Sequence, residues 1–389
     1  EQDRYARIIA ECAVSASILF IAARFASEAV VDASYVARKL IAELGYNQQG
    51  FNARTCSVLT SLQELPVDEY CCFDEYALTD EEIESIAAKN QVTVFGFACD
   101  QTPSLMPLPI YLAHKTSKRL SLVRRSKVLP YLAPEAKTDI GIQYKEGVPY
   151  RIYSITITAG QVERDSPSIE KLRCDIREAV IDPVFRNEPL KPDRGTEIFI
   201  NPEGPYSPGG PTVHSGLTGR KTGIDTYGEY SRHSGAALSG KDPLRIDRIG
   251  AYAARYAAKN VVAAGLAQEC EVQLSYSVSR ARPVSIQVET FGTGKISDER
   301  LAGLIEQNLE FRLAGIIRQF DLRNLPSRGK GGFFQKLAAY GQMGRTELDA
   351  PWEKVDSVDK LRDASGTRNI ETDSFTGIYN PSETPSMEQ

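Results

Sequence analysis

The chain has 389 residues, a formal net charge of −5 and 25% charged residues. Its length favours about two or three domains, and its composition is typical of a globular protein. The acidic balance argues against non-specific binding of nucleic acid, and no apolar run reaches the roughly 20 residues of a membrane span. Seven irregularly spaced cysteines form no CxxC pair, so we expect reduced thiols and a cytoplasmic protein.

Apolar periodicity predicts the elements of the first part of the chain. We expect two strands within residues 7–22, a helix over 33–45 that stops at Gly45, and a buried strand over 51–62. Residues 63–88 are rich in Asp and Glu, and Thr79 begins a helix-start signal. We interpret this acidic stretch as a mobile surface segment, which is either a solvated linker or an active-site lid.

The remaining elements follow a recurring rhythm of strands and helices. Strands are expected over 92–98, 139–144, 150–158, 196–200, 271–279 and 284–291, and helices over 107–123, 168–180, 247–265 and 298–308. This rhythm predicts α+β domains of similar build, with mixed or antiparallel sheets and helices on one face. From residue 357 on, Ser, Thr, Asp, Glu and Pro are frequent, which predicts a weakly ordered tail.

Glycines and basic residues alternate most densely between residues 209 and 247. This stretch contains Gly216-Leu217-Thr218-Gly219-Arg220-Lys221, Ser239-Gly240-Lys241-Asp242 and Arg245-Ile246-Asp247. Glycine lets the backbone approach a ligand closely, and Lys and Arg bind phosphate as a point charge and as a fork. A glycine-rich loop with solvated charges is the simpler interpretation of any one triplet. The whole stretch favours a nucleotide triphosphate site.

The same stretch resembles the methionine adenosyltransferase (S-adenosylmethionine synthetase) family. The resemblance runs from residue 1 to about residue 353 and is most specific at 216–228, 239–247, 251–259 and Ala338-Ala339-Tyr340-Gly341. It implies three α+β domains with pseudo-threefold symmetry. We place an N-terminal domain at 1–66, a mobile acidic segment at 67–90, a central domain at 91–202, a C-terminal domain at 203–354 and a tail at 355–389.

The resemblance implies an ATP-dependent reaction. Methionine sulfur attacks C5′ of ATP and expels triphosphate, which is cleaved to diphosphate and phosphate, with Mg²⁺ and K⁺ assisting. A thioether is already nucleophilic, so the protein has to position the reactants and stabilise a charged leaving group. The family also implies active sites between two subunits, in a homodimer or a dimer of dimers.

Site residues follow from the resemblance position by position. Catalytic roles fall on Lys137, Arg220 and Lys241. Binding of ATP and its phosphates is assigned to Glu135, Tyr206, Lys221, Asp225 and Arg245. Tyr206 replaces a phenylalanine of the family and Arg245 replaces a lysine. Asp225 matches a structural aspartate. Asp247 matches a Mg²⁺ ligand and Glu11 a carboxylate associated with K⁺.

Several positions depart from the family's pattern. The family's His-Pro-Asp-Lys, which would precede Glu1, does not occur in this sequence. Asn90, followed by Gln91, replaces an aspartate, His214 replaces another, and Arg24 replaces the glutamate of a Gly-Gly-Glu motif. Carboxylates suit the ammonium group of an amino acid, whereas Arg24 would repel it. The pocket for the second substrate is therefore altered.

Three functions remain open at this point. The first is an adenosyltransferase that uses ATP and L-methionine. The second is a non-catalytic or regulatory paralogue that forms a hetero-oligomer with a true synthetase. The third is an enzyme with the same ATP site that uses a different, more anionic nucleophile or hydrolyses the polyphosphate alone. None of these functions requires nucleic acid or a membrane.

Overall fold

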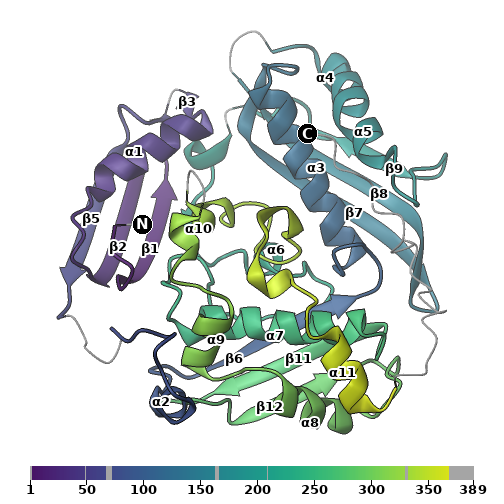
Figure 1. Cartoon of the computed structure of the whole chain (residues 1–389). Helices are drawn as coiled ribbons and strands as arrows, with labels where there is room; N and C mark the ends of the chain where they lie inside the picture. The colour runs from purple at the N-terminus through teal and green to yellow at the C-terminus, as the bar shows by residue number, and fades with distance from the viewer. Residues whose placement is uncertain are drawn as a thin grey trace.

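The computed structural model describes residues 2–48, 50–66, 72–162, 166–207, 209–328 and 332–367. The chain folds into three lobes, each built on a small sheet with helices on one face, and the short helices α6 and α10 lie between the lobes (Figure 1). The predicted α+β class with three similar domains is confirmed.

The N-terminal lobe contains a sheet of order β10-β1-β2-β5, made of β1 (Arg7–Ser15), β2 (Ile18–Ala26), β5 (Ser57–Glu64) and β10 (Gly216–Leu217). Helix α1 (Ala33–Leu44) covers one face. It starts where the Asp32 side chain accepts a hydrogen bond from the Tyr35 amide at 2.9 Å, and it ends at Gly45, whose φ is +90°. The helix prediction is therefore confirmed.

The predicted buried strand over 51–62 is wrong. The structure has a short hairpin of β3 (Asn47–Gln48) and β4 (Phe51–Asn52), and then β5, whose side chains are mostly exposed. Of this region, Phe51 and Cys56 are fully buried in the small core under α1, together with Ile41, and Ala53 and Val58 pack against it while partly buried. Apolar residues were taken as buried, but β5 is an edge strand and Leu59 and Leu62 remain about half exposed.

The central lobe contains the sheet β7-β8-β9, made of β7 (Leu132–Lys145), β8 (Val148–Gln161) and β9 (Glu197–Ile200). Its core face is covered by α3 (Leu108–Arg125), α4 (Ile169–Ile176), a π-helical turn η2 (Arg177–Ile181) and α5 (Asp182–Phe185). The hairpin of β7 and β8 is longer than predicted because pairing continues through register shifts at both ends of β7.

The third lobe is organised around α7 (Ile246–Ala263), which is buried along almost its whole length. Its sheet is β12-β11-β6, made of β6 (Val92–Cys99), β11 (Glu269–Tyr276) and β12 (Ser285–Glu289). A Cβ at Gly96 of β6 would lie 2.0 Å from the Ala254 carbonyl carbon, so glycine lets α7 pack directly on the strand.

The remaining helices are α2 (Asp80–Ser85), α6 (Thr222–Asp225), α8 (Asp298–Asn308), α9 (Leu313–Gln319), α10 (Phe333–Lys336), α11 (Val358–Ser365) and the 3₁₀ turns η3 (Gly210–Thr212), η4 (Leu325–Ser327), η5 (Thr346–Leu348) and η6 (Pro351–Glu353).

The sheets cross the divisions of the sequence. β6 precedes the central sheet in the chain but pairs with β11, with Val92 opposite Tyr276 and Cys99 opposite Glu269. β10 comes after the central sheet but pairs with β1, with Leu217 opposite Ala13. Each outer lobe is therefore completed by a distant segment, and the start of the 209–247 stretch lies against the first strand of the chain.

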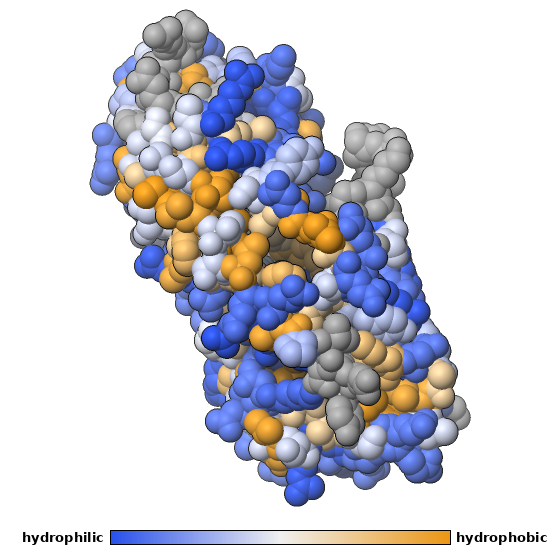
Figure 2. Space-filling model, turned by 90° about the vertical axis from the view of Figure 1, so that its left-hand side faces the viewer, coloured by the Kyte–Doolittle hydropathy of each residue, from blue (hydrophilic) through white to orange (hydrophobic). Residues whose placement is uncertain are grey.

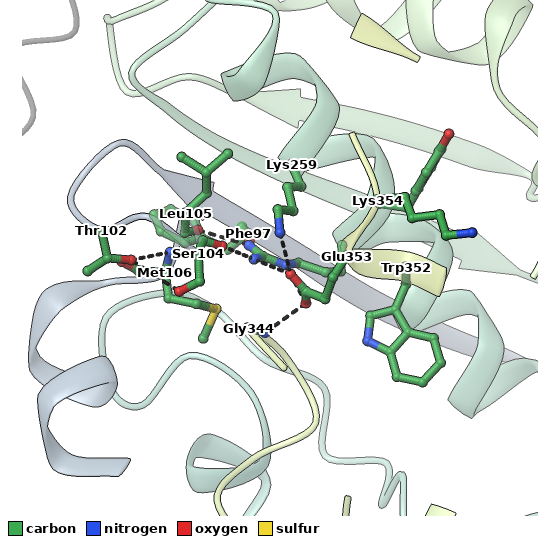
Figure 3. A network of polar contacts seen from close by, with 12 residues as sticks. Phe97, Thr102, Ser104, Leu105, Met106, Lys259, Gly344, Trp352, Glu353 and Lys354 are labelled. Atoms are coloured by element: carbon green, nitrogen blue, oxygen red, sulfur yellow. Dashed lines mark hydrogen bonds and ion pairs between the residues drawn. The ribbon is translucent and has the colours of Figure 1, made fainter. Parts of the chain in front are cut away.

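A buried ionic network fixes α7 within the third lobe (Figure 3). Arg255 has no exposed side chain, and its guanidinium donates to the Phe97 carbonyl at 2.6 Å and the Ser104 carbonyl at 2.8 Å. It also pairs with Glu353 at 2.9 Å, as Lys259 does at 2.8 Å. The network joins α7, β6 and the η6 turn, so it sets the direction of the helix whose first residues carry the candidate site.

Parts of two segments that were expected to be mobile or weakly ordered are packed against the core. The tail was expected to be weakly ordered from residue 357, but Val358–Ser365 forms α11, which packs on the core through the fully buried Leu361. Within the acidic segment, Glu75 is fully buried and pairs with Arg4 at 2.8 Å and Arg323 at 3.1 Å, which does not fit a solvated linker. Residues 67–71 and 368–389 of these segments lie outside the described residues.

None of the helices in the described part of the chain combines the length and the apolar character that crossing a bilayer requires.

Candidate functional site

Strand β1 holds the basic loops of the 209–247 stretch in place. The Ala10 amide donates to the Gly240 carbonyl at 2.7 Å, and a Cβ at Gly240 would lie 2.2 Å from the Ala10 oxygen, so this approach requires glycine. The buried Asp242 carboxylate accepts from the Ile8 amide at 2.8 Å. Sequence reasoning gave Asp242 no role, although it directly follows Lys241, because its partner is more than 200 residues away.

The best-defined part of the site is the group of Asn90, Lys241 and Asp247. The Asn90 amide donates to Asp247 Oδ1 at 2.6 Å, and Lys241 Nζ lies 3.4 Å from Asp247 Oδ2. The side chains of Lys241 and Asp247 are 14% and 5% exposed, so water screens this pair only weakly. Asp247 lies in the first turn of α7, where the helix dipole favours a negative charge.

Arg245 stands just before α7, at the wall of a cavity of about 470 Å³. Its Nε is buried without a hydrogen-bond partner among the described residues. The cavity is mainly apolar, but Arg7, Lys89 and Asn90 line it as well. Three cationic side chains therefore meet at one pocket beside Asp247, and sequence reasoning found only one of them.

Arg220 and Lys221 are exposed in the turn that follows β10. Thr218 fixes the start of this turn to β1, since its hydroxyl accepts from the Cys12 amide at 3.1 Å. Gly219 has a φ of +83°, and a Cβ there would lie 2.6 Å from the Ala237 side chain. The turn therefore runs beside the segment that leads to Lys241, but no ion pair joins Arg220 or Lys221 to another described residue.

A second group forms around Gly209. A Cβ at Gly209 would lie 2.1 Å from a Glu135 carboxylate oxygen, so this carboxylate points at the loop backbone. Both Glu135 oxygens are buried without a hydrogen-bond partner in the described part of the chain, and burial raises the pKa of Glu135. The rings of Tyr206 and His214 lie 6.3 Å apart, tilted by 33°, across the same loop.

Lys137, Glu11 and Arg24 lie on open sheet faces. Lys137 is opposite Thr158 and exposed, on the face of the central sheet away from its helices. In the N-terminal sheet, Arg24 is opposite Ile9 and Glu11 is opposite Ala22, so Arg24 and Glu11 share the exposed face away from α1. Lys241 is opposite Ile9 across the edge of β1, so its side chain lies on the same face as Arg24 and Glu11, but no ion pair or hydrogen bond among the described residues joins any of these three side chains to the Lys241 group.

Two further predicted residues lie apart from the basic loops. Asp225 ends α6, and burial raises its pKa to about 6, although Arg248 opposes this shift. Its partly buried position fits the structural role expected from the resemblance. The side chain of Gln91 is exposed. Its backbone amide donates to Asn90 Oδ1 at 3.0 Å, so Gln91 orients the Asn90 side chain.

The site was also tested for metal binding. No group of three or more His, Cys, Asp or Glu side chains among the described residues could enclose a metal. Mg²⁺ does not need such a cage, because it is commonly bound by one or two carboxylates together with substrate phosphates and water. The buried Asp247 carboxylate beside Lys241 and Arg245 fits that mode.

Comparison with known proteins identifies the family of this chain. Models of the N-terminal, central and C-terminal domains of S-adenosylmethionine synthetase match residues 1–66, 85–206 and 208–354. The chain belongs to the S-adenosylmethionine synthetase family. An S-adenosylmethionine synthase of Gloeothece citriformis is 46% identical over 377 residues, which cover 93% of this chain and 90% of the relative. Those of Trichormus variabilis and of Synechococcus sp. (strain JA-3-3Ab) are 46% and 44% identical, with the same coverage.

Proposed function

We propose that this member of the S-adenosylmethionine synthetase family converts ATP, L-methionine and water to S-adenosylmethionine, phosphate and diphosphate. The observation that carries the proposal is the Lys241–Asp247 pair at the start of α7, beside Arg245, in a chain similar to synthases over nearly its whole length. The comparisons give no support to a non-catalytic subunit or to a different nucleophile.

The adenosine part of ATP is assigned to the loop around Gly209. The two orphaned oxygens of Glu135 need hydrogen-bond donors, and ribose hydroxyls provide them. Tyr206 offers a ring face on which a purine can stack. Glu135 is on β7 and its carboxylate faces Gly209, in the loop that also carries Tyr206, so a nucleoside would satisfy a buried carboxylate and cover an aromatic ring at once.

The phosphates are assigned to Lys241, Arg245, Arg220 and Lys221. Lys241 and Arg245 are partly buried, so they interact with phosphate oxygens more strongly than fully solvated cations do. Asp247 would hold Mg²⁺ together with these oxygens, and the metal would neutralise charge on the leaving triphosphate. For K⁺, the resemblance assigns the carboxylate of Glu11, which lies on the open face of the N-terminal sheet.

The residues act mainly by positioning and by charge. The methionine sulfur attacks C5′ of ATP, the C5′–O bond breaks, and the electron pair leaves with the triphosphate. No base is needed because a thioether sulfur has no proton to lose. Lys241, Arg220 and Lys137 would stabilise the charge that develops on the leaving oxygen. The resemblance assigns Arg24, Asn90 and His214 to the methionine pocket, although within one chain Asn90 contacts Asp247 and the His214 ring lies beside Tyr206.

We assign a homodimer or dimer of dimers in which the open sheet faces pack together. Ile18, Phe20 and Leu59 lie on the exposed face of the N-terminal sheet and are 40% to 52% exposed. Figure 2, which views the molecule from the side of that sheet, shows apolar side chains open to solvent. Covering this face with a second copy would bury them and bring Glu11, Arg24 and Lys137 close to a neighbouring chain. The cytoplasm stays the expected compartment.

A product assay tests the function directly. The full-length protein is incubated with ATP, Mg²⁺, K⁺ and L-methionine, and nucleotides are followed by mass spectrometry. We expect S-adenosylmethionine and diphosphate to appear in equal amounts. Loss of ATP without this product, or no turnover in any of these mixtures, would contradict the proposed reaction.

A further inference from the structure

Asn90 occupies one side of the carboxylate assigned to the metal. Its Nδ2 donates to Asp247 Oδ1 at 2.6 Å, while Lys241 lies near Oδ2 at 3.4 Å. The side-chain oxygen of Asn90 accepts from the backbone amide of Gln91 at 3.0 Å. This contact fixes the Asn90 side chain with its nitrogen toward Asp247. One oxygen of Asp247 therefore accepts a hydrogen bond and the other faces an ammonium group, and almost none of this side chain is exposed.

An amide and a carboxylate at position 90 have opposite effects on Asp247. A carboxylate at the same distance would repel Asp247, and the two would together attract a divalent cation. The Asn90 amide instead supplies a donor, so Asp247 is already satisfied by Asn90 and Lys241. A free metal ion would have to displace one of these contacts and give up part of its own hydration for a single carboxylate.

We infer that Asn90 is a positioning residue that keeps Asp247 paired with Lys241 until a metal–polyphosphate complex binds. This inference rests on the proposed function. Phosphate oxygens would then attract Lys241 Nζ away from Asp247, and the Asp247 carboxylate would be available to hold the metal that accompanies the polyphosphate. Asn90 keeps Oδ1 and so holds the carboxylate in one orientation throughout. The site accepts metal and polyphosphate together rather than metal first.

Mn²⁺ is a suitable probe because its free and bound forms differ in electron paramagnetic resonance. The full-length protein is titrated with Mn²⁺, first alone and then with tripolyphosphate. We expect the wild type to bind Mn²⁺ weakly alone and tightly with tripolyphosphate. In Asn90→Asp, binding of Mn²⁺ alone should tighten by about 10-fold to 100-fold, the range in which groups around a metal ligand change its affinity.

Two variants separate a specific effect from a general change in charge. Asn187→Asp makes the same substitution at an exposed position outside the site and should leave Mn²⁺ binding unchanged. Asn90→Ala removes the donor without adding a carboxylate, so it should tighten Mn²⁺ binding less than Asn90→Asp does. Circular dichroism confirms that each variant is folded before titration.

The outcome does not depend on turnover. Equal binding of Mn²⁺ alone by the wild type and Asn90→Asp, or tight binding by the wild type without tripolyphosphate, would overturn the inference. The product assay with methionine is run on the same preparations. A shift in Mn²⁺ affinity without S-adenosylmethionine would contradict the proposed function and leave the role of Asn90 standing.

Discussion

At the scale of single residues, the site depends on charges that are partly withdrawn from water. Lys241 is mostly buried and its nearest opposite charge is Asp247, so its interaction with a phosphate oxygen is stronger than that of a surface lysine. Arg220 and Lys221 are exposed, and solvent weakens their contribution. The residue types were readable from the sequence, but this difference in burial was not.

Replacing Lys241 with alanine should abolish ATP turnover. The change removes the best-positioned cation from the leaving triphosphate, and the loss of one such group lowers turnover by about 100-fold to 1,000-fold. Diphosphate release with ATP and methionine measures it. Lys39→Ala, on the exposed surface of α1, is the matched control and should keep full activity. Unchanged turnover in Lys241→Ala would show that the phosphate site lies elsewhere.

Asp100 makes stability depend on pH outside the site. Burial, with the nearby Glu269, raises the pKa of Asp100 to about 6 from its ordinary value of 3.8. The folded protein therefore holds the proton more tightly than the unfolded chain does, and stability falls as pH rises from about 4 to about 6. Asp100→Asn should raise the free energy of unfolding at pH 8 by about 1 to 2 kcal/mol, and the thermal midpoint with it. At pH 4 the variant should gain little stability.

Thermal unfolding at pH 4, 6 and 8 checks this expectation. Asp349→Asn makes the same substitution at an exposed carboxylate and should not reproduce the pH-dependent gain. An equal effect of Asp100→Asn at pH 4 and pH 8 would contradict a contribution from the charge.

At the scale of elements, α7 connects the fold to the site. Its first turn carries Asp247, and its middle carries the network of Arg255, Lys259 and Glu353. The alanine-rich sequence predicted the helix, and Gly96 on β6 explains how closely it packs. The strand itself was predicted, but its packing against α7 was not, because a separation of more than 150 residues leaves no local signal.

Replacing Glu353 with glutamine should destabilise the third lobe. Burial alone would raise the pKa of Glu353, but Arg255 and Lys259 outweigh it and hold the pKa at about 2. This stabilisation is present above the unfolded pKa of about 4.5 and is lost as pH falls toward 2. Glu353→Gln leaves two buried cations without their partner, which costs about 3 to 5 kcal/mol.

Urea unfolding at pH 7 measures the loss. Glu203→Gln, at an exposed position, is the control and should have the stability of the wild type. Equal stability of Glu353→Gln and the wild type would mean that the network does not hold α7.

At the scale of the whole molecule, the proposed assembly rests on the open sheet faces. Lys137, Glu11 and Arg24 were grouped with the other site residues from the resemblance, but among the described residues no ion pair or hydrogen bond joins them to the Lys241 group. Lys241 is opposite Ile9, which is opposite Arg24, so these side chains share one face of the N-terminal sheet, whereas Lys137 lies on the open face of the central sheet. The apolar residues on the face that Glu11 and Arg24 share support the same view.

Placing a charge on that face should separate the subunits. Phe20→Asp puts a carboxylate among exposed apolar side chains, so we expect a smaller species in sedimentation velocity and a parallel loss of S-adenosylmethionine formation. Val30→Asp introduces the same charge at a residue that is 94% exposed, and it should change neither result. A wild type that sediments as a monomer, or an unaffected Phe20→Asp, would contradict the assigned interface.

The sequence by itself determined the α+β class, most helices and strands, and the basic stretch from residue 209 to residue 247, because periodicity, helix caps and glycine–cation spacing are local properties. The tertiary structure decided which loops β1 holds, that β6 and β10 complete distant sheets, and that Asn90 meets Asp247. It also showed that the strand expected over 51–62 is not buried, and that Val358–Ser365, in the tail expected to be weakly ordered, forms a helix. These features depend on contacts between residues far apart in the chain, and burial, unlike residue type, is a property of the folded whole.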